Sequence, residues 1–177
     1  MPPISFKPLS DSDLPRLHQW MQEKHVSSWW EEGTWSFKDL KEKYRTYALG
    51  YKMDQGKKKE VLAFIIELQK RPIGYIQMYN ALDFTREDFD PKEFWPDPLS
   101  SIGALDFYIG EPDCLGRGLG VEILQTFLAK HLFQHFNACL VDPDKKNTAA
   151  INAYTKAGFT MFQETESHII MIATKLD

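Results

Sequence analysis

The chain has 177 residues, of which 43% are hydrophobic, and its formal net charge at pH 7 is −4. This length suits one domain with a sizeable core, and the acidic balance disfavours nucleic acid as a partner. Apolar runs stay shorter than the ~18–20 residues of a transmembrane helix, the N-terminus lacks the features of a secretory signal, and the low cysteine content suits a reducing compartment. We therefore expect a single domain, residues 1–177, located in the cytoplasm and without a membrane partner.

The first third of the chain predicts two helices with a loop between them. Apolar residues repeat at helical spacing from 14 to 21, directly after capping residues at 10–13. A second helix is predicted to begin after Ser36 and to end at Gly50. The segment 25–33 follows neither the helical nor the strand period, so we expect a loop there.

The middle of the chain indicates strands. Residues 61–67 and 73–79 have the composition of a β-hairpin, with Arg71 and Pro72 in its turn. The polar segment 83–98 is rich in proline and is predicted to be a loop or a broken helix. A further strand is expected at 104–109.

The last third alternates between helices and strands. A helical pattern follows the glycine-rich segment 115–120, and a short strand is expected at 138–141. Asn147 can cap a helix that ends at Gly158, and 168–174 has the composition of a final strand. This order predicts an α/β (α+β) fold with one mixed, mostly antiparallel sheet flanked by helices.

The most informative segment is Leu115-Gly116-Arg117-Gly118-Leu119-Gly120. Glycines let successive N–H groups turn toward one point, and the start of the following helix adds its positive dipole end, which together suit a pyrophosphate. The P-loop pattern is excluded because Val121 and Glu122 stand where it requires Lys and Ser or Thr. A dinucleotide fold would place such glycines in its first βα turn. Coenzyme A remains as the ligand, and a tight turn that binds nothing is the alternative.

Two segments resemble the GNAT superfamily of coenzyme A-dependent N-acetyltransferases. Its pattern Arg/Gln-x-x-Gly-x-Gly/Ala falls on 115–120, with Leu115 in place of the first Arg or Gln. Residues 147–159 resemble its Asn-x-x-Ala-x-x-x-Tyr-x-Lys-x-Gly-Phe block. The resemblance implies the GNAT fold, in which central strands splay apart, and acetyl-CoA as the cofactor.

Further segments are similar to the aminoglycoside 6′-N-acetyltransferases within that superfamily. They are 25–30, 72–79 and Asp142 with Pro143, and enzymes that acylate siderophore precursors share part of them. The resemblance covers nearly the whole chain, but the segment 83–98 aligns poorly.

Asp106 is the candidate for receiving the amine. It lies in the apolar run 104–109, where a carboxylate is costly unless it has a partner such as a substrate ammonium. The resemblance implies that it orients the amine or accepts its proton, directly or through water. The alternative is an edge-strand side chain in water.

Tyr154 is the candidate acid. It lies two helical turns after Asn147, and the resemblance implies that its phenol reaches the sulfur of coenzyme A, where it can donate a proton to the departing thiolate. The alternative is a core aromatic residue beside Ile151.

The resemblance also implies the set of residues that contact the cofactor. A backbone N–H near Tyr108 or Ile109 would polarise the thioester carbonyl, and Asn147 would contact the pantetheine arm, although a role as helix cap is sufficient for it. The expected cofactor residues are Phe107, Tyr108, Ile109, Leu115, Gly116, Arg117, Gly118, Leu119, Gly120, Asn147, Ala150, Tyr154 and Lys156.

The substrate is expected to be a polycationic amine, which by resemblance is an aminoglycoside. Acidic residues in 83–98 would attract it; they are Asp83, Glu87, Asp88, Asp90, Glu93 and Asp97. A solvated acidic loop is the alternative, and the tryptophans that could stack on sugar rings could instead lie in the core. The expected substrate residues are Trp29, Tyr44, Gln77, Trp95, Asp106 and Asp142.

We therefore expect direct acetyl transfer from acetyl-CoA to the 6′-amine of an aminoglycoside in a ternary complex, by a monomer or homodimer. The alternatives are acylation of another amine, such as a siderophore precursor or a polyamine, and an acyl-CoA-binding module without catalysis. A covalent intermediate on Cys114 is disfavoured because no basic group is near it in sequence. No metal is expected, because His131 and His135 lack an evident third ligand.

Overall fold

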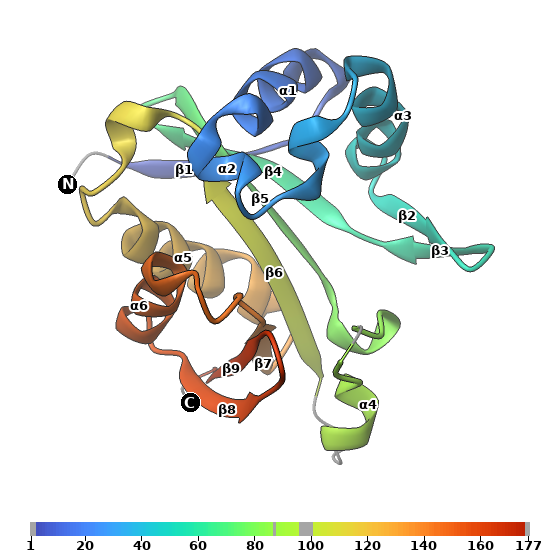
Figure 1. Ribbon diagram of the computed structural model, residues 1–177, viewed down its shortest axis with the longest axis vertical. Helices are drawn as coiled ribbons and strands as arrows, with labels where there is room; N and C mark the ends of the chain where they lie inside the picture. The colour runs from blue at the N-terminus through green and yellow to red at the C-terminus, as the bar shows by residue number, and fades with distance from the viewer. Residues whose placement is uncertain (1–2, 87, 96–100, 176–177) are drawn as a thin grey trace. The chain divides into compact units, whose positions relative to one another are not determined.

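The computed structural model describes residues 3–86, 88–95 and 101–175 (Figure 1). They form two compact units, Met1–Gln77 with Asp106–Arg117, and Met78–Leu105 with Gly118–Asp177. Two strands, β5 (Arg71–Asn80) and β6 (Ile102–Ile109), run through both units. Glu87 and Asp97, which the sequence assigns to the acidic segment, lie outside the described residues. None of the described helices combines the length and apolar character that a bilayer crossing requires.

The first unit combines helices with antiparallel strands. Strand β1 pairs with β4, with Ile4 opposite Leu68. A separate two-stranded sheet is formed by β2 and β3. The other elements of this unit are β1 (Ile4–Pro8), η1 (Asp11–Asp13), α1 (Leu14–Gln22), α2 (Lys24–Ser27), η2 (Glu31–Thr34), α3 (Phe37–Ala48), β2 (Tyr51–Asp54), β3 (Lys57–Glu60), β4 (Leu62–Leu68) and η4 (Pro112–Cys114).

The helices of the first unit begin where the capping residues predict. The apolar face of α1 is buried, and Ser36 accepts a hydrogen bond from the backbone N–H of Asp39 at 3.2 Å, which caps α3. The predicted loop at 25–33 is wrong in part, because α2 and η2 lie there. Each is only four residues long, which is too short for a helical period to show in the sequence.

The hairpin of β4 and β5 is confirmed, but its turn is not where we expected it. Gln69 and Lys70 form the turn with φ of 52° and 65°, and Arg71 and Pro72 begin β5. Two positive φ values are typical of the tight turns that match the twist of paired strands. Proline near the first residue of a strand loses no essential hydrogen bond. The strands β1, β2, β3 and β8 were not anticipated from the sequence.

The second unit holds the remaining helices and strands, and α5 packs against α6 (Figure 1). Strand β9 pairs antiparallel with both β7 and β8. The elements of this unit, apart from its parts of β5 and β6, are η3 (Ala81–Asp83), α4 (Pro91–Phe94), α5 (Leu119–Lys130), η5 (Leu132–Gln134), β7 (Ala138–Val141), α6 (Thr148–Lys156), β8 (Thr160–Glu164) and β9 (Ile169–Thr174). The predicted helix after the glycines, the strand at 138–141 and the helix capped by Asn147 are confirmed.

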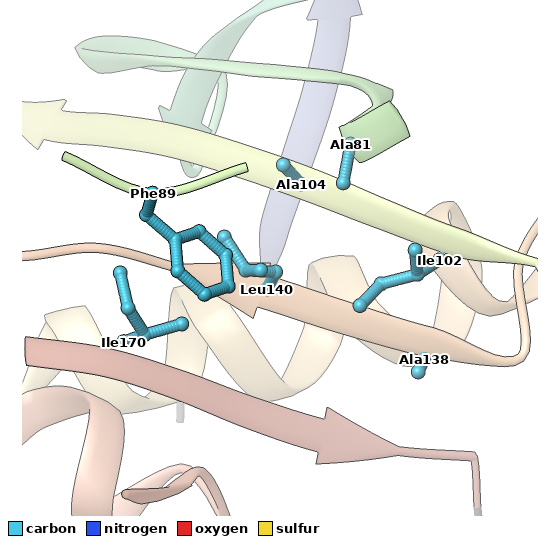
Figure 2. Packing of buried hydrophobic residues seen from close by; sticks show 7 residues of the cluster. All are labelled: Ala81, Phe89, Ile102, Ala104, Ala138, Leu140 and Ile170. Carbon is cyan, nitrogen blue, oxygen red and sulfur yellow. The ribbon is translucent and has the colours of Figure 1, made fainter. Parts of the chain in front are cut away.

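A compact apolar cluster anchors the segment between β5 and β6 to the sheet of the second unit. Phe89 and Ala81 come from that segment, and the other members come from β6, β7 and β9 (Figure 2). The cluster consists of Ala81, Phe89, Ile102, Ala104, Ala138, Leu140 and Ile170. Burial of this apolar surface holds Ala81 and Phe89 against the strands.

The main sheet has seven strands in the order β1-β4-β5-β6-β7-β9-β8. Strands β6 and β7 are parallel, and their pairing covers only Ile102–Ala104 of β6, which continues to Ile109. The other described pairings are antiparallel. The predicted mixed, mostly antiparallel sheet flanked by helices is therefore confirmed.

Candidate functional site

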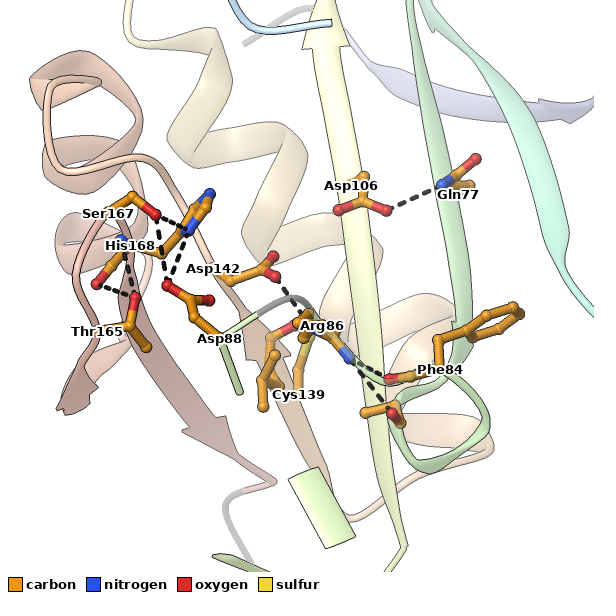
Figure 3. Close-up of polar contacts among 12 residues, drawn as sticks. Gln77, Phe84, Arg86, Asp88, Asp106, Cys139, Asp142, Thr165, Ser167 and His168 are labelled. Carbon is orange, nitrogen blue, oxygen red and sulfur yellow. Dashed lines mark hydrogen bonds and ion pairs between the residues drawn. The ribbon is translucent and has the colours of Figure 1, made fainter. Parts of the chain in front are cut away.

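The carboxylate of Asp106 is held by a short chain of hydrogen bonds in the first unit. Gln77 on β5 donates from Nε2 to Asp106 Oδ2 at 2.9 Å (Figure 3). Tyr75, two residues earlier on the same strand, donates from its hydroxyl to Gln77 Oε1 at 2.7 Å. Asp106 is partly exposed, whereas Tyr75 is fully buried. Asp106 lies beyond Ile102–Ala104, the part of β6 that pairs with β7, and its carboxylate accepts a hydrogen bond from Gln77, whereas the edge-strand alternative places this side chain in water.

Buried phenols surround these residues. Burial raises the pKa of Tyr75 well above its ordinary value, and the neighbouring Tyr47 and Tyr108 raise it further. Burial likewise raises the pKa of Tyr44, with Tyr75 and Glu32 as the next causes. These hydroxyls therefore remain protonated at neutral pH and act as hydrogen-bond donors.

Tyr44, an expected substrate residue, lies in the core. Its side chain has no exposed surface, and its hydroxyl donates to Oε1 of the buried Glu32 at 3.3 Å. Lys43 forms an ion pair with the same carboxylate, and its ammonium lies 5.3 Å from the centre of the Trp35 ring. Tyr44 thus faces an ion pair whose acidic member is buried.

The tryptophans differ in their surroundings. Trp29 has an exposed fraction of 45%, so its ring is open to a ligand. Trp30 packs edge-on against Tyr75 and Tyr108, with ring centres 6.0 and 4.9 Å away. Trp95 is half-buried in the second unit, where it packs against the apolar cluster.

Close packing fixes the backbone at the end of β6. A side chain at Gly74 would overlap the carbonyl of Tyr108, so only glycine lets β5 approach so closely. The N–H of Gly110 donates to the carbonyl of Ile73 at 2.7 Å, and Nε2 of His25 lies 3.0 Å from the carbonyl of Ile109. The carbonyls of Tyr108 and Ile109, next to the amides expected to polarise the thioester, thus contact β5 and His25.

The glycine-rich segment has the backbone conformation that an anion site requires. Gly116 and Gly118 have φ of 70° and 76°, and no atom lies within 4 Å of where a side chain would begin on either. Gly118 caps α5 without any side-chain hydrogen bond, and in the first turn of that helix the N–H of Val121 donates to the carbonyl of Gly118 at 3.2 Å. Leu115 and Arg117 are exposed, whereas Leu119 is buried. This geometry fits a diphosphate bound by main-chain amides.

Cys114 precedes these glycines and is almost completely buried. Burial raises the pKa of its thiol, and the Asp113 carboxylate raises it further. A buried, protonated thiol is a poor nucleophile. The structure thus supports direct transfer over a covalent intermediate on this residue.

The block at 147–159 forms α6 and the residues after it. Asn147 accepts a hydrogen bond from the N–H of Ala150 at 3.2 Å, so its role as helix cap is confirmed. Tyr154 is 7% exposed and packs edge-on against Phe159, with ring centres 5.3 Å apart, while Lys156 is exposed. Tyr154 is therefore part of the core, and its position two turns after Asn147 is confirmed.

Asp142, expected to bind the substrate, has a cationic partner within the protein. Arg86 donates from Nε to Asp142 Oδ2 at 2.9 Å and from Nη1 to the carbonyls of Phe84 at 3.0 Å and Ala81 at 3.3 Å (Figure 3). The side chain of Arg86 is 13% exposed. The guanidinium thus links the backbone at Ala81 and Phe84 to Asp142 and balances the charge of that carboxylate.

Two carboxylates that follow β6, and Asp88 of the acidic segment 83–98, also have partners within the protein. Arg71 forms ion pairs with Asp113 at 2.8 Å and with Glu111 at 3.1 Å. Asp88 accepts a hydrogen bond from Ser167 at 3.4 Å and lies 3.7 Å from Nδ1 of His168. The attraction of these carboxylates for a polycationic substrate is therefore weaker than their number in the sequence suggests.

Three polar contacts near the candidate residues were not predicted from the sequence: the ion pair of Arg86 with Asp142, the ion pair of the buried Glu32 with Lys43, and the hydrogen bond from Tyr75 to Gln77. Arg86 and Glu32 lie in segments without periodicity, Lys43 lies on the predicted helix after Ser36, and nothing local identifies their partners. The signal for Tyr75 was present, because it alternates with Gln77 on a predicted strand and so shares its face.

The comparisons with known proteins agree with this arrangement. The acetyltransferase (GNAT) domain family matches residues 10–167. Aminoglycoside N(6′)-acetyltransferase type 1 of Klebsiella pneumoniae is 28% identical over 164 residues, which cover 88% of this chain and 73% of that protein. The aminoglycoside acetyltransferase AAC(6′)-Ib in complex with coenzyme A and kanamycin has a TM-score of 0.79 and 26% identity, and the match covers 98% of this chain and 95% of that one. AAC(6′)-Ib with paromomycin and acetyl-CoA gives the same TM-score and identity, over 97% of this chain and 93% of that chain.

Proposed function

Because the chain belongs to the GNAT acetyltransferase family, we propose that it transfers the acetyl group of acetyl-CoA to the 6′-amine of an aminoglycoside, by direct attack in a ternary complex. The observation that carries this proposal is the Asp106 carboxylate on β6, which a neutral amide orients. Relatives that bind coenzyme A and kanamycin support the choice of substrates.

Asp106 would perform the first step, which concerns the amine. Its carboxylate attracts the substrate ammonium and accepts a proton from it, directly or through water, which leaves a lone pair on nitrogen for the attack. Acetyl-CoA supplies an activated thioester. The new bond joins the amine nitrogen to the acetyl carbon, and the carbon–sulfur bond breaks.

Tyr154 would perform the last step by donating its phenolic proton to the departing thiolate. A backbone N–H around Tyr108 or Ile109 would polarise the acetyl carbonyl. The loop 115–120 would hold the diphosphate through its main-chain amides, and the glycine conformations described above fit that role. Phe107, Asn147, Ala150 and Lys156 complete the proposed contacts with the cofactor.

For the substrate, we assign direct contact to Asp106 and to the exposed ring of Trp29, which offers a face to a sugar ring. Tyr44, Gln77, Trp95 and Asp142 are engaged with protein groups, so we assign them to shaping and supporting the site. The alternative in which Trp95 lies in the core describes it better than sugar stacking does.

We further propose that both units belong to one GNAT-type domain, because the family match at 10–167 runs through both. A cytoplasmic location is consistent with the two buried free cysteines. A monomer or homodimer that needs neither nucleic acid nor a membrane surface would suffice for this chemistry.

The test is thiol release from acetyl-CoA with a panel of amines, followed by mass spectrometry of the product. Kanamycin and tobramycin are expected to release thiol and to gain one acetyl group on the 6′-nitrogen. Paromomycin, which has a 6′-hydroxyl, is the matched control and is expected to react far more slowly. Release only with polyamines or siderophore precursors would replace the proposed substrate, and binding of acetyl-CoA without release for any amine would indicate a binding module.

A further inference from the structure

We propose that Tyr75 and Gln77 set the orientation and ionisation of the Asp106 carboxylate, which makes Gln77 a positioning residue for this acid and not a ligand of the substrate. The inference rests on the proposed function for the role of Asp106 in catalysis. It departs from our sequence-based expectation, which placed Gln77 among the residues that touch the substrate.

The strand geometry brings these side chains together. Side chains at alternate positions of a strand share one face, so Tyr75 lies beside Gln77 on β5 and Tyr108 beside Asp106 on β6. Gln77 meets Asp106 at 2.9 Å, and the rings of Tyr75 and Tyr108 stack with centres 5.7 Å apart. The amide between a phenol and a carboxylate is therefore built into two adjacent strands.

The direction of the Gln77 amide follows from the chemistry of its neighbours. An ionised carboxylate only accepts hydrogen bonds, so the amide must present Nε2 to Asp106 and Oε1 to Tyr75. The hydroxyl of Tyr75 must then donate, and it can do so because burial raises the pKa of this phenol well above its ordinary value. A flipped amide would place two acceptors against each other at Asp106 and leave the buried Tyr75 hydroxyl without an acceptor.

Gln77 is also poorly placed to serve the substrate. Its side chain is 9% exposed, and both its oxygen and its nitrogen already hydrogen-bond within the protein. Its contact with Asp106 does two things. It fixes the plane of the carboxylate, and it favours the ionised form without adding a positive charge that would compete with an ammonium.

Other titratable groups face this region, and they must not be mistaken for Asp106. The phenols have pKa values raised by burial, so they do not titrate in the acidic range. Glu32 is buried and forms an ion pair with Lys43. In a titration followed by NMR, the resonance that is missing in the Asp106→Asn variant is the one that belongs to Asp106. The groups are Tyr75 on β5, Tyr108 on β6, Lys43, Tyr44 and Tyr47 on α3, and Glu32 on η2.

Two substitutions test the proposal, one at Gln77 and one at Tyr75. Gln77→Met keeps the length of the side chain but removes the donor. Tyr75→Phe keeps Gln77 but removes the hydroxyl that fixes the direction of its amide. Tyr51→Phe makes the same chemical change in the separate two-stranded sheet and is the matched control.

The first readout is the titration of the Asp106 carboxyl carbon by NMR in protein labelled with ¹³C at aspartate, without any substrate. Loss of one donor to the ionised form should move the midpoint of this titration upward by about 0.5 to 1 pH unit in Gln77→Met. Tyr75→Phe should move it in the same direction by less, and Tyr51→Phe should not move it. Identical midpoints in wild type, Gln77→Met and Tyr75→Phe would overturn the proposal.

The second readout is the pH profile of kcat/KM with kanamycin. A positioning role predicts that the acidic limb moves upward together with the NMR midpoint and that kcat falls about three- to tenfold with little change in KM. If Gln77→Met instead raises KM at every pH and leaves the acidic limb in place, Gln77 is a substrate ligand and the proposal is wrong. If Gln77→Met does not fold, Tyr75→Phe answers the same question.

The two readouts separate this inference from the proposed function. A wild-type protein that fails to acetylate any aminoglycoside would refute the proposed function, while the NMR titration would still measure the coupling of Gln77 to Asp106. Active enzyme with an unchanged titration in the variants would refute only the positioning role.

Discussion

The carboxylates of Asp106 in the first unit and Asp142 in the second have partners of different charge. Gln77 holds Asp106 through a neutral amide at 2.9 Å, and Arg86 holds Asp142 through a guanidinium at the same distance. A neutral donor orients a carboxylate and leaves its charge in place, whereas a cation cancels most of the field that would attract an ammonium. The proposed function therefore assigns the cationic amine to Asp106 and not to Asp142, although the two hydrogen bonds have the same length.

A cation also balances the charge of two carboxylates that follow β6. Asp113 and Glu111 share Arg71. Local charge counts in the sequence overstate the attraction for a polycation, because they do not show which acids are already balanced.

The strongest test of the comparison is Asp106→Asn. It preserves the shape of the side chain and removes its charge, so kcat should fall at least ~100-fold, the low end for a positioned base. Steady-state thiol release at saturating acetyl-CoA measures the effect. A rate close to that of the wild type would remove Asp106 from the mechanism.

Gly118→Asp would add a carboxylate to the loop 115–120, where we propose that the diphosphate of the cofactor binds. The two negative charges would repel each other. Gly118→Asn is its matched control, because both side chains suffer the same left-handed backbone at φ of 76° and only one carries charge. Calorimetry with acetyl-CoA should show binding to the Asp variant at least about tenfold weaker than to the Asn variant. Equal affinities would contradict the diphosphate site at 115–120.

Tyr154→Phe removes the hydroxyl group that we propose as the proton donor and leaves every carboxylate unchanged. The ring keeps its packing on Phe159, so the melting temperature should change little. Removal of the proton donor should lower kcat about tenfold, which is modest for general acid catalysis because a thiolate is a good leaving group. An unchanged kcat at all pH values would leave Tyr154 with a purely structural role.

Asp142→Asn is expected to have a much smaller effect than Asp106→Asn. Since Arg86 already balances this carboxylate, the KM for kanamycin should rise by no more than roughly threefold, with kcat unchanged. Arg86→Gln should lower that KM by a similar factor, and the double variant measures the coupling of the pair. If Asp142→Asn lost as much activity as Asp106→Asn, the charge of the partner, Arg86 or Gln77, would not decide which carboxylate serves the substrate.

Tyr108→Phe should have the smallest effect, and it concerns stability alone. Within the described part of the chain, the buried hydroxyl of Tyr108 has no hydrogen-bond partner. Its removal should raise the free energy of unfolding by about 1 kcal/mol, since an unsatisfied buried polar group is costly. Urea denaturation measures the change, and a decrease of that size would reveal a partner that forms in solution.

Sequence alone was sufficient wherever neighbours along the chain decide the outcome. The periods of α1, α3 and α5, the cap that Asn147 provides for α6, and the glycines before α5 are local, because backbone hydrogen bonds and φ values depend on adjacent residues. The shortest elements, such as α2 and η2, were missed because packing and not periodicity maintains them.

The partners of the charged side chains could only come from the tertiary structure. Gln77 and Asp106 are 29 residues apart, and Arg86 and Asp142 are 56 apart, so chain folding decides which donor meets which acid. The sequence identified Asp106 as a candidate through its place in an apolar run and Asp142 through the resemblance of its segment to the aminoglycoside 6′-N-acetyltransferases. Whether each keeps its charge for a substrate depends on the group that the fold places within hydrogen-bond distance, because electrostatic interactions act through space and not along the chain.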